Sequence, residues 1–428
     1  MLLDGELKLL LDGEKKTDAK RRARTIAFIP LTFAAGLFRT IPLCILVPGS
    51  IHLGLTPSQA ALMLVAQPLS SFPALLIAPM LSKMRDAYYI LLAGVLGGLA
   101  FTSFHFAPEM GIIGYMVFAG IALFASGAAD FFLSNKIAVG WTILLNGDVA
   151  KSSMAWEMIN NVGKALGAYL GTLLTLKFGF PVTMMVNGLM WLFMTIMFVV
   201  VFPEQVNMKS EDEAEFNLKS MYKMHFTIDT LLYGWIPMFC IGGCVVFVEA
   251  VLTEFYSIEY SKSLEFGGAV LGAGSVIYSI STMVVGPLGV RFVSLQYLFL
   301  VLGLAGVGVM LLLLGPAITI PQLAENETTV SASAFCLMLI SSSAIQYSSL
   351  AVTARVLSDQ VSADHAMSIA MNVWNLAYNA GAVLGPLVAS GLLGLTHLGY
   401  RGTFTVGAPF FFASAIIVSL IDFIRKDH

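Results

Sequence analysis

The sequence predicts an all-α membrane protein whose twelve transmembrane helices form two six-helix halves. Three observations predict this fold class. The composition is too apolar for a soluble protein, apolar runs of about 20 residues recur along the chain, and a polar motif of the first half reappears in the second.

The composition separates this chain from soluble globular proteins. Of its 428 residues, 57% are apolar and 11% are charged, and the mean hydropathy is +0.84. Soluble proteins carry about 25% charged residues. The long fourth run fits either two segments or one helix that extends past the bilayer. We expect spans at 25–49, 58–82, 87–107, 111–144, 153–177, 180–202, 228–254, 265–290, 294–316, 330–356, 364–394 and 401–424.

The basic residues predict the orientation of the chain. Lysine and arginine gather in the N-terminal tail 1–24, in alternate loops and in the C-terminal tail 425–428. Because positive residues stay cytoplasmic, we expect both termini inside. Asn326-Glu-Thr328 is a glycosylation acceptor sequence, and this orientation places it outside. Glu6 to Leu11 fits either an acidic dileucine signal or an amphipathic helix, so a vesicle, endolysosomal or plasma membrane location stays open.

The repeated motif predicts the division into halves. Trp156–Gly167 and Trp374–Gly385 lie 218 residues apart and share a tryptophan, an asparagine, a leucine and two glycines. They fall in the fifth and eleventh expected spans. We infer two related halves, 25–202 and 228–424, joined by a cytoplasmic linker, 203–227. In transporters built from repeats, the substrate binds near the midplane between them.

Small residues of the motif predict close helix packing. Glycines spaced by four residues line one helix face and let a neighbouring backbone approach. The cysteines Cys44, Cys240, Cys244 and Cys336 fall within spans and are typical of apolar packing residues rather than of a disulfide or metal site. The expected packing positions are Gly163, Gly167, Gly171, Gly381, Gly385 and Pro386.

Ionisable residues inside spans are the candidate functional residues. Intramembrane charges are costly and usually mark a pathway or relay. At 100° per residue, Glu157, Asn160, Asn161 and Lys164 form one polar stripe. The repeat has Asn375 and Ala382 in place of Glu157 and Lys164, so the charges are not required to build the helix. A functional pair and a structural ion network both remain open.

Further candidates come from other spans. Arg39 must pair with an acid, Asp130 being the first choice, or hold an anionic group. Our candidates for proton coupling are Glu157, Asp130 and Glu249. Our candidates for substrate binding are Arg39, Asn161, Lys164, Gln346, Tyr347, Asn375 and Asn379.

The order of several short motifs resembles one family. Glu157 precedes Gly163-x-x-x-Gly167-Ala168-x-x-Gly171, and the chain also contains Gly54-Leu-Thr56, Ala78-Pro79, Lys177-Phe-Gly-Phe-Pro181, Phe247-Val-Glu249 and Leu313-Leu-Gly-Pro316. Together they resemble the vesicular amine and polyamine transporters of the major facilitator superfamily. The resemblance implies the major facilitator fold and proton-driven antiport of an organic cation. Arg39 stands where those carriers have acidic residues, so an organic anion or zwitterion stays open.

We therefore expect a secondary transporter that works by alternating access, and not an enzyme. No His-Glu-x-x-His, Gly-x-Ser-x-Gly or Gly-x-x-x-x-Gly-Lys-Ser/Thr pattern occurs. An uncoupled facilitator and a non-transporting receptor on the same fold are the alternatives. The expected partners are a small-molecule substrate, protons and the lipid bilayer, without nucleic acid, cofactor or metal, and we expect a monomer.

Overall fold

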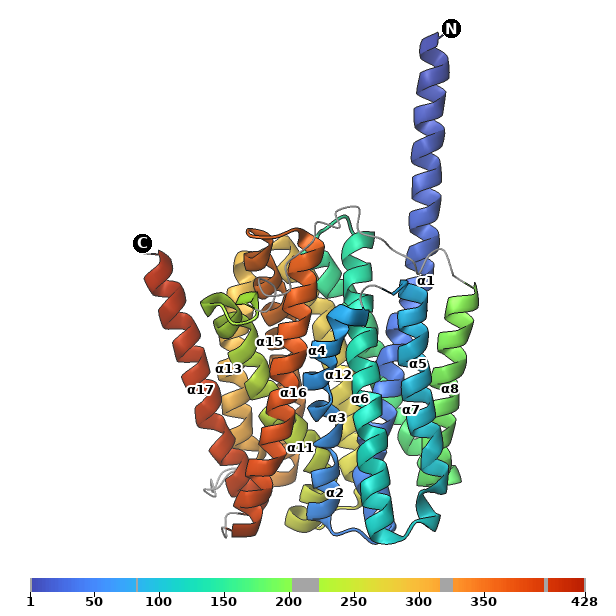
Figure 1. Cartoon of the computed structure of the whole chain (residues 1–428). Helices are drawn as coiled ribbons and strands as arrows, with labels where there is room; N and C mark the ends of the chain where they lie inside the picture. The colour runs from blue at the N-terminus through green and yellow to red at the C-terminus, as the bar shows by residue number, and fades with distance from the viewer. Residues whose placement is uncertain (1, 82–83, 202–222, 316–325, 396–398, 427–428) are drawn as a thin grey trace.

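Long helices that run roughly side by side form the molecule, with both chain ends at the same end of the bundle (Figure 1). The structure is a computed structural model of the chain and describes all residues except 1, 82–83, 202–222, 316–325, 396–398 and 427–428. Most of the expected linker 203–227 therefore lies outside the described residues.

The first half contains α1 to α8, and the second contains η2 to α17. The first half consists of α1 (Leu2–His52), α2 (Pro57–Met63), α3 (Ala66–Leu69), α4 (Ser71–Leu81), α5 (Asp86–Thr102), η1 (Ser103–Glu109), α6 (Gly111–Leu144), α7 (Val149–Phe178) and α8 (Phe180–Val201). The second consists of the π-helical turn η2 (Thr230–Trp235), α11 (Ile236–Tyr260), α12 (Leu264–Arg291), α13 (Ser294–Leu314), α15 (Glu327–Ser358), α16 (Ala363–Leu395) and α17 (Gly399–Lys426).

The helices agree with the expected spans. Within the described residues, nine helices are long and apolar enough to cross a membrane. The other three expected spans correspond to the broken segment α2–α4 and to α7 and α16, which carry the polar motif. The long fourth span is one helix, α6. Each of the twelve expected spans thus has a helical counterpart.

The second span was expected to be continuous over 58–82, and this expectation was wrong. The structure interrupts it after Met63 and again after Leu69. Pro68 and Pro73 have no backbone N–H, so neither can donate to the carbonyl four residues earlier. At the second interruption, the Ser70 hydroxyl donates to the Gln67 carbonyl at 2.7 Å.

Two helix crossings repeat the same geometry in the two halves. In the first half, α7 crosses α1 so closely that a Cβ on Gly163 would overlap the Phe33 carbonyl oxygen. In the second half, α16 crosses α11, and a Cβ on Gly381 would overlap the Phe239 carbonyl oxygen. Gly167 and Gly171 meet the α1 backbone, Gly385 meets the α11 backbone, and Pro386 lies within α16. The small residues therefore set the distance between these helices.

The halves meet along the two motif helices. The helix α7 packs against α12 of the second half, and α16 packs against α6 and the broken span of the first half. The tryptophans that open the two copies of the motif, Trp156 and Trp374, contact each other edge to face with ring centroids 5.6 Å apart. The motif thus lies at the interface between the halves.

Candidate functional site

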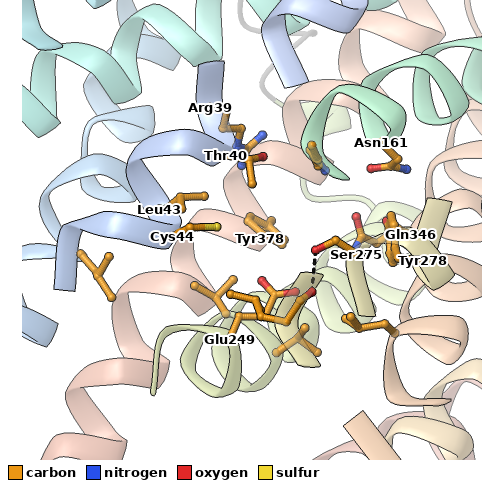
Figure 2. Close-up of a pocket in the computed structure, with 16 residues that line it drawn as sticks. Arg39, Thr40, Leu43, Cys44, Asn161, Glu249, Ser275, Tyr278, Gln346 and Tyr378 are labelled. Carbon is orange, nitrogen blue, oxygen red and sulfur yellow. Dashed lines mark hydrogen bonds between the residues drawn. The ribbon is translucent and has the colours of Figure 1, made fainter. Parts of the chain in front are cut away.

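A cavity of about 120 Å³ lies between the halves. In Figure 2, Arg39 and Thr40 of α1 occupy one side, Glu249 of α11 occupies the other, and Tyr378 of α16 lies between them. The remaining lining residues are half apolar and half polar. The polar lining residues are Arg39, Thr40, Cys44, Asn161, Lys164, Glu249, Ser275, Tyr278, Gln346 and Tyr378.

Arg39 forms the ion pair expected from the sequence. Its guanidinium lies 3.3 Å from the Asp130 carboxylate of α6, and both side chains are nearly buried. It also lies 5.8 Å from the ring centroid of Tyr378, across the boundary between the halves. The Ser134 hydroxyl donates to Asp130 at 3.4 Å. The charge of Arg39 is therefore balanced by Asp130, which does not itself line the cavity.

Glu157 lies just outside the lining and is almost completely buried, at 1% exposure. The Asn161 amide donates to its Oε2 at 2.8 Å. Its other oxygen, Oε1, has no hydrogen-bond partner among the described residues. Within the expected polar stripe, Asn161 thus links the carboxylate of Glu157 to the cavity.

Asn161 also connects the two halves. Its amide lies 3.4 Å from the Thr282 hydroxyl of α12, and its backbone carbonyl accepts a hydrogen bond from Ser279 at 2.9 Å. The Thr282 hydroxyl in turn donates to the Tyr278 carbonyl of its own helix at 3.0 Å. Beside the cavity, α7 and α12 therefore make a polar contact between the two halves.

Lys164 and Glu249 carry the remaining charges of the lining. Lys164 comes from the first half, and its ammonium lies 6.0 Å from the Tyr278 ring centroid. Glu249 comes from the second half. Neither makes an ion pair or a side-chain hydrogen bond within the part of the chain that the structure describes. Electrostatic attraction acts on Lys164 from both Glu157 and Glu249.

The charges in and beside the cavity do not cancel. Two cations, Arg39 and Lys164, face three carboxylates, Asp130, Glu157 and Glu249, and these groups interact electrostatically. Two positive and three negative charges leave one excess negative charge when all five are ionised. Such a cluster can take up one positive charge, either a proton or a cationic ligand.

The halves touch on the side of the cavity nearer the chain ends. Trp156 and Trp374 meet there, and Asn135 of α6 donates a hydrogen bond to Asn372 of α16. On α7 and α16, these residues precede the lining residues Asn161 and Tyr378 and so lie closer to the termini. The conformation is therefore closed on the terminal side of the cavity.

A comparison with protein families decides what this architecture is. The model of the Major Facilitator Superfamily matches residues 28–369. The chain belongs to the Major Facilitator Superfamily. As a member, it is an integral, multi-pass membrane transporter.

Solved structures of other major facilitator proteins share the fold. The crystal structure of the transporter FucP in the outward conformation has a TM-score of 0.67 and 15% identity, covering 92% of this chain and 97% of that one. A crystal structure of the E. coli fucose:proton symporter FucP has a TM-score of 0.65 and 14% identity with the same coverage. No curated protein matches the sequence significantly. At these identities, the likeness establishes the fold alone.

The cavity of this major facilitator protein gathers part of the candidate set. Arg39, Asn161, Lys164, Glu249 and Gln346 line it, and Glu157 and Asp130 each contact a lining residue. Three other candidates lie elsewhere. Tyr347 is buried against Gly289 of α12, Asn375 is buried beside Trp374, and Asn379 is half-buried on α16. Because neighbouring helix residues point about 100° apart, Gln346 and Tyr347 face different directions.

Some lining residues were missed in the sequence. Tyr378 occupies the repeat position of Asn160, which belongs to the predicted polar stripe of α7. The repeat could therefore have predicted that Tyr378 faces the cavity. Ser275, Tyr278 and Thr282 recur at three- and four-residue spacing along α12 and mark a polar helix face. The hydrogen bond between Asn135 and Asn372, outside the lining, was not predicted, because this pairing depends on how the halves meet.

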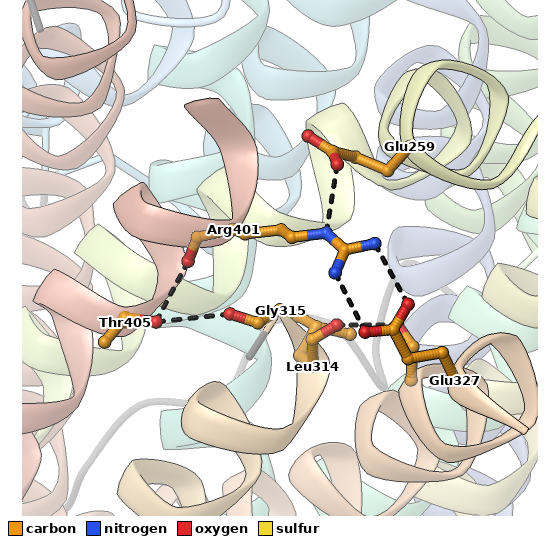
Figure 3. Close-up of polar contacts among 7 residues, drawn as sticks. Glu259, Leu314, Gly315, Glu327, Arg401 and Thr405 are labelled. Carbon is orange, nitrogen blue, oxygen red and sulfur yellow. Dashed lines mark hydrogen bonds and ion pairs between the residues drawn. The ribbon is translucent and has the colours of Figure 1, made fainter. Parts of the chain in front are cut away.

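A second charged cluster lies at the end of the second half away from the chain termini (Figure 3). Arg401 of α17 donates to Glu259 of α11 at 3.0 Å and, through two nitrogens, to Glu327 of α15 at 2.9 and 3.2 Å. Paired guanidinium contacts of this kind fix geometry as well as charge. Asn326 precedes Glu327, so the acceptor sequence lies at the end opposite the C-terminus, and its extracytoplasmic location stays a prediction.

Proposed function

We propose that this transporter exchanges protons for a small organic cation, an amine, by alternating access around the central cavity. One observation carries the proposal. Glu249 offers the cavity a carboxylate without an ion-pair partner among the described residues, beside the aromatic ring of Tyr378. Carboxylates and aromatic faces are the groups that attract organic ammonium ions. The resemblance to vesicular amine and polyamine transporters supports the same substrate class.

The three acids take different roles in this proposal. Asp130 neutralises Arg39. Glu249 holds the ammonium group of the substrate. Glu157 carries the coupling proton, because its Oε1 atom can be protonated without displacing an existing contact. Lys164 and Arg39 are the cations that act on Glu157, and Tyr278 and Tyr378 also face it.

The excess negative charge explains why proton and substrate exchange. With one proton bound or one monovalent cation bound, the cluster of five ionisable groups is neutral. With both or neither, a net charge remains at membrane depth, where uncompensated charge costs several kcal/mol. Each positive charge therefore favours the release of the other, which is the requirement for antiport.

Lys164 favours a second candidate function, proton-coupled transport of an organic anion. Its ammonium also lines the cavity without an ion-pair partner in the described chain. The FucP relative is named a fucose:proton symporter, so proton coupling on this fold can also run in the other direction. The excess of acids over bases favours the cation as the substrate.

The test replaces Glu157 by Gln in the full chain reconstituted in liposomes. Glu157→Gln keeps the shape and fixes the neutral state, so uptake of choline driven by an acidic interior falls to the level of empty liposomes. Choline exchange between equal, saturating concentrations survives, because exchange does not require release of the proton, although the loss of the excess negative charge weakens choline binding. Choline is chosen because its permanent charge prevents passive trapping in acidic vesicles, and putrescine serves as a second probe.

The controls separate a transport role from a structural one. Asp359→Asn makes the same carboxylate-to-amide change at an exposed position after α15 and leaves driven uptake unchanged. Wild-type coupling in Glu157→Gln would contradict the role of Glu157. If neither probe enters wild-type vesicles above background, the organic cation is the wrong substrate class. A structural pair would instead give poor expression of Glu157→Gln and recovery in the double variant with Lys164→Gln.

A further inference from the structure

We infer that Asn161 is a positioning residue that converts the protonation of Glu157 into a change in the contact between the two halves. The inference rests on the proposed role of Glu157. It goes beyond that role by naming the contact through which protonation of Glu157 changes the conformational equilibrium. One side chain lines the cavity, bonds the candidate proton carrier and bonds the opposite half.

The two bonds of the Asn161 amide differ in length, and the difference sets the direction of the switch. The amide lies 2.8 Å from Glu157 and 3.4 Å from the Thr282 hydroxyl. An N–H···O bond is usually 2.7–3.2 Å long, so the first contact is strong and the second is weak. Bonds to a charged acceptor are roughly twice as strong as neutral ones. An ionised Glu157 therefore draws the amide toward itself, so the second N–H of the amide reaches the Thr282 hydroxyl of α12 only at 3.4 Å.

Protonation changes this balance. A neutral Glu157 no longer offers a charged acceptor, so it draws the amide less strongly and the second N–H of the amide can move closer to the Thr282 hydroxyl. The Thr282 hydroxyl is a suitable acceptor because its own proton is donated to the Tyr278 carbonyl. Protonation of Glu157 thus strengthens the bond between α7 and α12, and release of the proton weakens it.

The position of the Asn161–Thr282 bond lets it affect the opening of the terminal side. Asn161 lines the cavity, and Trp156, which meets Trp374 where the terminal side is closed, lies five residues earlier on the same helix. The Asn161 carbonyl also accepts from Ser279, so both bonds must break if α7 and α12 separate there. The strength of the Asn161 bond therefore contributes to the free energy of opening.

The internal repeat offers a matched comparison. Asn379 is the same residue type at the equivalent position of α16, yet it is only half-buried and makes no side-chain hydrogen bond with another described residue. Asn161 is completely buried. The repeat thus keeps the amide in both halves, while only α7 has a carboxylate one turn away and a partner hydroxyl on the other half.

The charged and titratable groups around Glu157 define what else could respond to pH. Lys164 lies on the same helix, Arg39 on α1, and the phenols Tyr278 and Tyr378 on α12 and α16. Glu157 accepts a hydrogen bond from the Asn161 amide, and the Tyr278 phenol also interacts with the Asn161 side chain. A response that disappears in Glu157→Gln and in a Thr282 variant is therefore specific to this route.

The experiment measures opening on the terminal side with a thiol reporter. Ser153→Cys places the reporter on α7, where the residue is fully buried in the closed conformation. The four native cysteines are replaced by Ser or Ala, and a membrane-impermeant maleimide is applied from the terminal side in oriented vesicles. We expect labelling to accelerate by roughly 3- to 10-fold as Glu157 loses its proton, the range expected for one net hydrogen bond.

Variants of Thr282 decide the inference. Thr282→Val removes the hydroxyl while keeping the volume, so labelling becomes fast and independent of pH while choline binding is retained. Thr282→Ser restores the pH response. Asn379→Leu, the matched control, leaves it unchanged, whereas Asn161→Leu abolishes it. A wild-type pH response in Thr282→Val overturns the inference, even if Glu157→Gln confirms the proton site.

Discussion

Five ionisable side chains share one small region of the membrane interior, and the geometry gives each a different environment. Arg39 and Asp130 form a direct ion pair. Glu157 has one amide donor, and Lys164 and Glu249 face the cavity without an ion-pair partner among the described residues. A buried ion pair contributes little net stability, but breaking it by removing one partner is strongly destabilising. Removing one charge of a structural pair should therefore destabilise the fold, whereas removing a functional charge should change transport.

The Arg39–Asp130 pair gives a prediction at this scale. Arg39→Gln or Asp130→Asn alone leaves a buried charge uncompensated and costs about 3–5 kcal/mol of stability. The double variant removes both charges and recovers most of the loss. Thermal unfolding in detergent of the two single variants and the double variant measures this coupling. Additive losses, with no recovery in the double, would show that the pair does not stabilise the fold.

Among the helices, α7 and α16 show how one motif serves two purposes. Both carry the glycines that bring them against α1 and α11, and both place a tryptophan at the interface between the halves. Only α7 adds an acid and a lysine, Glu157 and Lys164. The packing function is therefore common to both helices, and the candidate chemistry is confined to one.

The glycine crossing predicts a sharp difference between two similar substitutions. Gly163→Ala would push a Cβ into the Phe33 carbonyl oxygen, whereas a Cβ on Gly120 of α6 meets nothing within 4 Å. We expect Gly163→Ala to lose about 1–3 kcal/mol through overpacking. Gly120→Ala is neutral or gains up to about 1 kcal/mol from helix propensity. Melting temperatures of the two variants measure this, and equal shifts would contradict the close crossing.

Across the whole molecule, the sequence predicted the architecture better than the site. Apolar runs predict the helices directly, because membrane helices satisfy their backbone hydrogen bonds internally. The repeat at a spacing of 218 residues predicts the two halves. The break in the second span was missed, although Pro68 and Pro73 lie within it. The cavity residues Ser275 and Tyr278 come from one helix, α12, which carries no charged residue at those positions. Their convergence depends on how the halves dock, which no local pattern records.

The docking of the halves also yields a prediction for the transport cycle. Alternating access requires the contact on the terminal side to separate once per cycle. Asn135 and Asn372 hydrogen-bond across it, so the pair Asn135→Cys and Asn372→Cys, in a chain whose native cysteines are replaced, should be joined by a short bis-methanethiosulfonate reagent, which spans a longer distance than a direct disulfide. We expect both driven uptake and exchange of choline to stop, and reduction to restore them.

A cross-link within one half provides the matched control. Ser281 and Ser343 hydrogen-bond at 2.6 Å between α12 and α15, both in the second half. If the halves move as rigid bodies, linking Ser281→Cys to Ser343→Cys leaves transport intact, because that distance never changes. Arrest by both cross-links would indicate motion inside the second half. Continued transport with Asn135→Cys joined to Asn372→Cys would show that the terminal contact is not a gate, and the closed side would then have to open around it.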